Sequence, residues 1–145
     1  MHFRNDFSFV AQAPIDVAAS LFGADKERVW APDWNPVFLW PQEGGDHPGM
    51  VFTVAHGDRR AVWVNTIFDL AAGRIQYVYV LPDVVATVIS LRLAPIGNTT
   101  GVAVTYERTA LREAARDAVR HMAECDANAG PAWEHQINAY LTTRR

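Results

Sequence analysis

Apolar and polar residues alternate in short runs along much of this chain, a pattern that predicts β-strands. In the first run, over residues 3–11, Phe7 and Phe9 share one side while Asp6 and Ser8 lie on the other. Six further runs cover residues 37–40, 50–56, 61–69, 74–81, 85–94 and 99–109. Turn-forming residues separate them by short connections, which join antiparallel neighbours because a parallel crossover needs about a dozen residues. We therefore expect one curved antiparallel sheet of about seven strands.

Two short helices are predicted between the first and second strands. Pro14 suits the first position of a helix that Gly23 ends. Asp25 suits the N-cap of a second helix, which reaches Trp30 before Pro32 stops it. Both helices are too short to cover a sheet, so the cover must come from another part of the chain.

Residues 111–141 consist mainly of helix formers and predict one long helix, with Thr109 as its N-cap. Its apolar stripe is formed by Ala115, Val119, Met122, Ala129, Trp133, Ile137 and Tyr140. Because Pro131 lacks a backbone N–H and clashes with the preceding turn, we expect a bend near residues 127–131. A helix of about 30 residues would be about 45 Å long, enough to cover the concave face of the sheet. The predicted fold class is therefore α+β, with the long helix over the sheet.

Size and charge narrow the range of functions. The 145 residues, half of them apolar, fit a single domain that spans residues 1–145. The net charge of −3, without a basic cluster beyond Arg144 and Arg145, argues against nucleic acid as a partner. No apolar run approaches the roughly 18 residues of a membrane span. The single cysteine, Cys125, and an N-terminus without a signal-peptide pattern predict a cytoplasmic protein, and the composition leaves a homodimer open.

Aromatic residues are unusually frequent, with five Trp, seven Phe and four Tyr, and such rings must be buried or line a cavity. The segment of residues 27–36, ERVWAPDWNP, leads into the second predicted strand. With the order of elements, this segment resembles the START-like helix-grip (SRPBCC) superfamily, in particular small bacterial polyketide cyclase/dehydrase-like and lipid-transport members. The resemblance covers essentially the whole chain and is most specific over residues 30–40, at Phe52 and over residues 133–141.

The resemblance implies a deep cavity between sheet and helix that takes lipids, sterols, polyketides or other apolar ligands. It implies no reaction, because binders, carriers, chaperone activators and cyclases share this scaffold. It also transfers no catalytic residue by position, because the superfamily lacks a shared catalytic motif.

The implied cavity would be lined by the aromatic segment, the strands and the long helix. The residues that we expect to contact a ligand are Trp30, Trp34, Phe38, Trp40, Phe52, Val54, His56, Tyr77, Tyr106, Met122 and Trp133. Strand parity does not settle the direction of Trp63 and Tyr79, because both faces of their strands carry apolar residues. These two rings either line the cavity or form a partner surface on the convex face.

Two residues are candidates for proton transfer. His56 would point inward near the end of its strand, where an imidazole can act as acid or base; the alternative is a rim position beside Gly57. Asp126 lies one turn after Met122 on the covering helix, where it could accept a proton or simply occupy the helix edge.

No cofactor or metal is predicted. His121 and His135 would lie about 21 Å apart along one helix, and His121 with Cys125 lacks a third and a fourth ligand. The sequence contains no Gly-rich nucleotide-binding motif and no Gly-x-Ser-x-Gly nucleophile motif. Glu27 and Asp33, which flank the tryptophan segment, are expected to serve a helix start and a turn.

Three functions therefore remain. The first is binding or carriage of a small hydrophobic or aromatic molecule, anchored by a polar residue such as His56 or Tyr106. The second is a polyketide cyclase or dehydratase in which His56 or Asp126 moves a proton. The third is a protein-interaction module of the chaperone-activator kind that exposes Trp63 and Tyr79. An open cavity would favour the first two functions, and exposed rings over a filled interior would favour the third.

Overall fold

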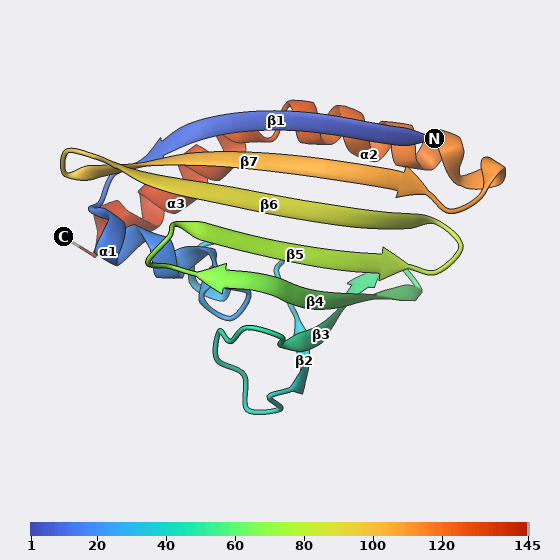
Figure 1. The fold of residues 1–145 in the computed structure, drawn as a ribbon, viewed down its shortest axis with the longest axis horizontal. Helices are drawn as coiled ribbons and strands as arrows, with labels where there is room; N and C mark the ends of the chain where they lie inside the picture. Colours follow the sequence, from blue (N-terminus) through green and yellow to red (C-terminus); the bar gives the residue numbers. More distant parts are fainter. Residues whose placement is uncertain (145) are drawn as a thin grey trace.

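The computed structural model describes residues 1–144 and contains a seven-stranded antiparallel sheet in the order β1-β7-β6-β5-β4-β3-β2 (Figure 1). The strands are β1 (His2–Ala11), β2 (Val37–Trp40), β3 (Val51–His56), β4 (Arg59–Asp69), β5 (Arg74–Leu81), β6 (Val85–Ile96) and β7 (Thr99–Ala110). The predicted α+β class and strand number are confirmed. β1 and β2 lie at opposite edges of the sheet, so the connection over residues 12–36 must cross one of its faces.

The helices are α1 (Ile15–Ala18), η1 (Ala19–Phe22), η2 (Lys26–Val29), η3 (Glu113–Ala115), α2 (Arg116–Ala127) and α3 (Gly130–Thr143). The predicted long C-terminal helix is confirmed, and so is the position of its bend, at Asn128 and Ala129, where the structure separates α2 from α3. The α-helix begins at Arg116 and not at residue 111. Pro131 lies in the first turn of α3, where its missing N–H costs no helical hydrogen bond. Thr109 is not an N-cap, because it pairs with Ala86 inside β7.

Strand register brings two rows of side chains onto the concave face. One row crosses the sheet through Asn5, Tyr106, Ile89, Tyr77 and Asn65. The next row crosses it through Phe3, Arg108, Thr87, Tyr79, Trp63, Phe52 and Phe38. Directly opposite partners share a face, so each row projects to one side. Trp63 and Tyr79 are only 9% and 4% exposed, so of the two alternatives left open, the partner surface made of these two rings is excluded.

The outer edge of β1 is covered by polar side chains of α3. The backbone N–H of Val10 donates to Glu134 Oε2 over 3.0 Å, and the backbone carbonyl of Val10 accepts from Asn138 Nδ2 over 2.9 Å. Asn138 also accepts from the backbone N–H of Gln12 over 2.8 Å. These bonds replace a missing neighbour strand and fix α3 alongside β1, where Figure 1 shows it. In residues 1–144 we find no helix with the length and apolar character needed to cross a bilayer.

Candidate functional site

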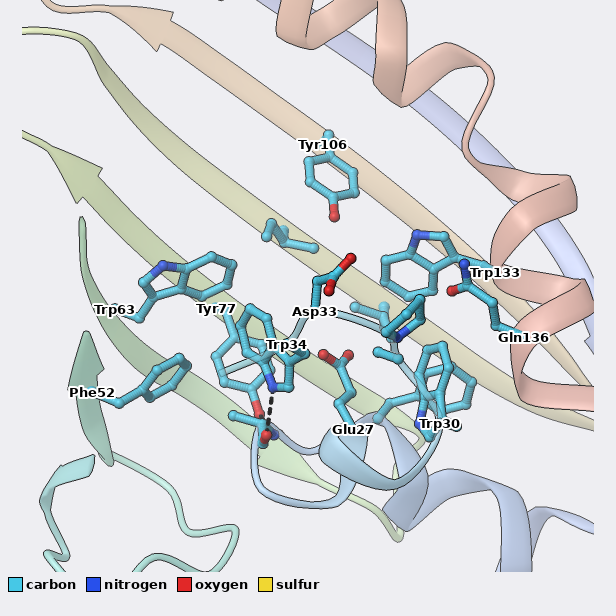
Figure 2. A pocket seen from close by; sticks show the side chains of 16 residues that line it. Glu27, Trp30, Asp33, Trp34, Phe52, Trp63, Tyr77, Tyr106, Trp133 and Gln136 are labelled. Atoms are coloured by element: carbon cyan, nitrogen blue, oxygen red, sulfur yellow. Dashed lines mark hydrogen bonds between the residues drawn. The ribbon is translucent and has the colours of Figure 1, made fainter. Parts of the chain in front are cut away.

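A cavity of about 200 Å³ lies between the concave face of the sheet, α3 and the connection from β1 to β2 (Figure 2). We call it the aromatic cavity. It is lined by Phe22, Ala24, Glu27, Trp30, Ala31, Pro32, Asp33, Trp34, Phe52, Trp63, Tyr77, Ile89, Leu91, Tyr106, Trp133 and Gln136. The connection thus closes the cavity on one side and α3 on another, which is why neither element alone makes the site.

Two groups of stacked and edge-on rings form the walls of the aromatic cavity. The Trp133 wall consists of Phe22, Trp30 and Trp133, with the two indole rings 5.9 Å apart. The Trp63 wall consists of Trp34, Phe52, Trp63 and Tyr77, with the Trp34 and Trp63 rings 5.3 Å apart. Figure 2 shows Trp30 and Trp133 on one side of the cavity and Trp63 with Phe52 on the other. Within residues 1–144 no ring pair joins the two walls, so space is left between them.

Hydrogen bonds fix the connection over residues 12–36, which we call the crossing segment, within itself and at one point to the sheet. The indole N–H of Trp30 donates to the carbonyl of Leu21 over 2.6 Å, and that of Trp34 donates to the carbonyl of Ala24 over 2.7 Å. The backbone N–H of Ala24 in turn donates to the Tyr77 hydroxyl over 2.8 Å. Ala24 is therefore fixed through both of its backbone groups, and the two tryptophans are fixed with their ring faces available to the cavity.

Asp46 fixes the start of η2 and, with it, the position of Glu27. Its carboxylate accepts from the backbone N–H groups of Asp25 and Lys26 over 2.8 and 3.1 Å, as an acid does at a helix N-terminus. This contact requires glycine at position 23, because a Cβ there would lie 2.1 Å from the carboxyl carbon of Asp46. Burial raises the pKa of Asp46 above its usual value, against the lowering effect of these two backbone hydrogen bonds.

Glu27 and Tyr106 bring polar groups into the aromatic cavity from opposite sides. Figure 2 shows the Glu27 carboxylate and the Tyr106 hydroxyl pointing into the space between the walls, with Asp33 and Gln136 nearby. Burial raises the pKa of Glu27 well above its usual value, and the negative charge of Asp46 adds to this effect. Burial likewise raises the pKa of Tyr106. Because a carboxyl with a raised pKa can hold or accept a proton near neutral pH, the site has the means for hydrogen bonding and proton transfer.

Asp33 occupies a turn at the mouth of the cavity. Its backbone has a positive φ of 60°, a conformation that aspartate tolerates better than most residues. The expected turn role is consistent with this geometry, and the turn also directs the Asp33 carboxylate toward the cavity. The cavity therefore contains two carboxyl groups at different depths.

A second polar cluster, centred on Arg108, lies on the concave face outside the cavity. Arg108 Nε and Nη2 donate to the two carboxylate oxygens of Asp126 over 2.6 and 2.8 Å. Arg108 Nη1 donates to the hydroxyls of Tyr79 and Thr87 over 2.6 and 3.2 Å. Burial alone would lower the pKa of Arg108, but Asp126 first, and Tyr79 with it, raise it above its usual value. The cluster joins α2 to three strands as a paired, hydrogen-bonded unit.

No protein-family model matches this sequence, and no curated protein matches it either. Solved structures match it in fold. Norcoclaurine synthase from Thalictrum flavum superposes with a TM-score of 0.72 at 10% identity, covering 100% of this chain and 89% of that one. The Zhui aromatase/cyclase from Streptomyces sp. R1128 superposes with a TM-score of 0.66 at 15% identity, covering 99% and 93%. Ara h 8.0201 superposes with a TM-score of 0.62 at 14% identity, covering 99% of both chains.

The chain has the helix-grip fold of these structures. The resemblance seen in the sequence is thereby confirmed at the level of architecture. Sequence identities of 10% and 15% show a shared fold but no shared ligand or reaction. The ligand and any reaction must therefore be inferred from the aromatic cavity itself.

Six of the predicted ligand-contacting residues line the aromatic cavity of this helix-grip fold: Trp30, Trp34, Phe52, Tyr77, Tyr106 and Trp133. Five do not: Phe38, Trp40, Val54, His56 and Met122. Trp40 does not reach the cavity because the strand register shifts between Phe38 and Trp40, which turns the Trp40 ring away from the concave face of the sheet. The Trp40 side chain is 52% exposed and packs against His47. Phe38 packs behind Phe52, with ring centres 6.2 Å apart.

The two candidates for proton transfer also lie outside the cavity. Asp126 is engaged by Arg108, and Met122 lies beside them, with its sulfur 3.7 Å from the guanidinium. His56 is half-buried and stacks on Tyr79, with ring centres 5.6 Å apart. Burial lowers the pKa of His56, and the positive charge of Arg108 lowers it further. Asp126 and His56 therefore belong to the Arg108 cluster. The polar groups that face the aromatic cavity are those of Glu27 and Tyr106.

Three functional features were not predicted. The inward direction of Glu27 could have been suspected, because an acid inside a tryptophan-rich segment is unusual. Trp63 was left open, and its direction follows only from the register. The pairing of Arg108 with Asp126 joins residues 18 positions apart on different elements and leaves no local signal. Among residues 1–144 no group of three His, Cys, Asp or Glu side chains is placed to hold a metal ion.

Proposed function

We propose that this protein binds a small aromatic molecule in the aromatic cavity. The observation that carries the proposal is the pair of ring walls, the Trp133 wall and the Trp63 wall, which face each other across about 200 Å³ of space. Aromatic rings gain more than simple burial when they meet other rings edge-on or offset. A flat aromatic ligand between these walls would gain that energy on both faces.

The cavity volume favours a small ligand over the larger classes that the fold can take. An apolar cavity of about 150 Å³ holds benzene, whereas sites for drug-sized ligands span about 300–1,000 Å³. The aromatic cavity, at about 200 Å³, lies near the lower figure. We therefore favour compounds with one aromatic ring over sterols, long acyl chains and extended polyketides.

Thermal unfolding in the presence of a compound panel tests this proposal. A ligand that binds only the folded protein stabilises it by about 2.7 kcal/mol at 100 times its dissociation constant. We expect single-ring aromatics to raise the melting temperature and cholesterol and palmitate to leave it unchanged. The variant Ile89→Phe, which adds volume at the cavity floor, should remain folded and lose the response. A panel in which only the sterol or fatty acid stabilises the protein would contradict the proposal.

A cyclase-type enzyme is the second candidate. It is favoured by the Glu27 carboxyl, which faces the cavity with a raised pKa, and by the enzyme names of two fold neighbours, a synthase and an aromatase/cyclase. Proton transfer would then fall to Glu27 and Tyr106, because His56 and Asp126 do not line the cavity. A positioned acid or base contributes about 10²–10⁴-fold to rate. If a reaction is found, Glu27→Gln should slow it by at least about 100-fold and His56→Ala should leave it unchanged.

The proposal also includes a cytoplasmic location and a homodimer, both of which the sequence allows. Sedimentation velocity of the purified chain tests the dimer: a single species of twice the 16.1 kDa chain mass supports it, and a monomer at all concentrations rejects it. Fractionation of the native cell tests the location.

A further inference from the structure

The charges that line the aromatic cavity are of one sign. Its lining includes the carboxyl groups of Glu27 and Asp33 and, among residues 1–144, no lysine, arginine or histidine. Asp46, which fixes η2, lies close enough to raise the pKa of Glu27 by its own negative charge. A buried carboxylate without a cation is costly, because it has lost water and gained no counter-ion.

Among residues 1–144 no hydrogen-bond donor of the lining engages the Glu27 carboxylate. The indole N–H groups of Trp30 and Trp34 donate to backbone carbonyls, and the Tyr77 hydroxyl accepts from the backbone N–H of Ala24. The indole N–H of Trp63 is buried without an acceptor and lies on the side of its ring away from Glu27 (Figure 2). Apart from the Tyr106 hydroxyl and the Gln136 amide, the lining presents mainly the faces of aromatic rings, which carry negative partial charge.

The cations nearest the cavity are already paired or exposed. Arg108 lies 5.0 Å from the centre of the Tyr106 ring but is held by Asp126. Arg28 forms an ion pair with Asp25 and lies over Phe38, outside the cavity. Neither guanidinium is thus placed as the counter-ion of Glu27, and within residues 1–144 no hydrogen bond or ion pair engages the Glu27 carboxylate.

We infer that the ligand of the aromatic cavity is an organic cation, an aromatic ammonium whose positive charge pairs with Glu27 while its ring lies between the two walls. The inference rests on the proposed function and adds the ligand's charge to it. An ammonium supplies the positive charge that the lining lacks, donates its N–H groups to Glu27, and gains from the ring faces by cation–π attraction. A neutral aromatic leaves the Glu27 carboxylate without a counter-ion, and an anion would meet two carboxyl groups.

The electrostatics of the empty cavity agree with this assignment. Burial and Asp46 raise the Glu27 pKa, so without ligand the carboxyl tends to hold a proton. A bound ammonium favours the ionised carboxylate, and the proton leaves for solvent. Asp33, at the mouth, adds attraction along the entrance.

Three single-ring probes that differ mainly in charge test the inference at neutral pH. Benzylamine is cationic, benzyl alcohol is neutral and benzoate is anionic, and tryptophan fluorescence reports binding because four tryptophans line the cavity. We expect benzylamine to bind roughly tenfold or more tightly than benzyl alcohol, as hydrogen bonds to charged groups allow. Benzoate should bind most weakly. Glu27→Gln should lower the benzylamine affinity by a similar factor and leave that of benzyl alcohol nearly unchanged.

Glu124→Gln is the matched control, because it removes one carboxylate from an exposed position on α2. It should leave all three affinities unchanged. Benzyl alcohol or benzoate binding as tightly as benzylamine would overturn the inference and leave the proposed function standing. Failure of all three probes to bind would overturn both. The relative affinities of the three probes for the unaltered protein test the inferred charge of the ligand even if Glu27→Gln does not fold.

Discussion

Replacing Asp126 by asparagine should destabilise the fold severely, because it leaves Arg108 buried without a counter-charge. The two side chains are only 9% and 8% exposed, and two short hydrogen bonds join them. Asparagine keeps the shape of aspartate and one acceptor oxygen but removes the charge. The remaining partners of the guanidinium, Tyr79 and Thr87, are neutral hydroxyls.

Removing one partner of a buried ion pair costs about 3–5 kcal/mol. For a chain near 150 residues, each kcal/mol lowers the melting temperature by about 4 °C, so the expected loss is about 12–20 °C. A folded domain of this size has about 5–15 kcal/mol of stability in total, so Asp126→Asn should lose at least about a fifth of it.

Urea unfolding of Asp126→Asn measures this loss directly. The control is Asp117→Asn on the same helix, whose side chain is 94% exposed and pairs with Arg120 at 3.6 Å. That variant should change the free energy of unfolding by less than about 1 kcal/mol. The double variant Arg108→Leu with Asp126→Leu should recover part of the loss, because apolar replacement removes the unpaired charge as well. Asp126→Asn within about 1 kcal/mol of the unaltered protein would refute the structural role assigned to this pair.

Three further predictions concern the crossing segment. The folded-state pKa of Glu27 is raised above its unfolded value, so its contribution to stability is full below about pH 4 and is lost as pH rises through the folded pKa. Glu27→Gln should therefore be more stable than the unaltered protein at neutral pH and lose that advantage in acid, as urea unfolding across a pH series would show; equal stability at every pH would contradict the raised pKa. Gly23→Ala should lose about 1–3 kcal/mol in urea unfolding, because its Cβ meets Asp46 at 2.1 Å; an unchanged midpoint would mean that Asp46 is held less firmly than described. Tyr77→Phe should lose about 1–3 kcal/mol in the same assay, because the Ala24 N–H is left buried without its acceptor, and no loss would show that water replaces it.

Much of the fold follows from local patterns in the sequence. The strand runs are set by alternation and turn residues, both of which act over a few positions. The break near Pro131 was located correctly because proline cannot continue the preceding turn of a helix but suits the first turn of the next one. Its outcome, two helices instead of a bent one, depends on how α2 and α3 each pack against β1, which no local pattern encodes.

The site was predicted less completely than the fold. Rings in the crossing segment were identified, but Trp40 was assigned to the cavity because a register shift cannot be read from alternation. Trp63 and Tyr79 were ambiguous because their strands carry apolar residues on both faces, such as Val62 and Val80 on the outer one. The role of Glu27 depends on Asp46, which lies 19 positions away and meets it only in the folded chain.

The indole N–H signals of the five tryptophans test the central claim most directly. Trp30, Trp34, Trp63 and Trp133 line the aromatic cavity, and Trp40 lies outside it as an internal control. Two-dimensional nuclear magnetic resonance of the ¹⁵N-labelled protein, titrated with benzylamine, follows all of these signals at once. The account predicts that the signals of the four cavity tryptophans shift together and saturate while that of Trp40 stays in place. Signals that remain unmoved, or a shift confined to Trp40, would contradict it.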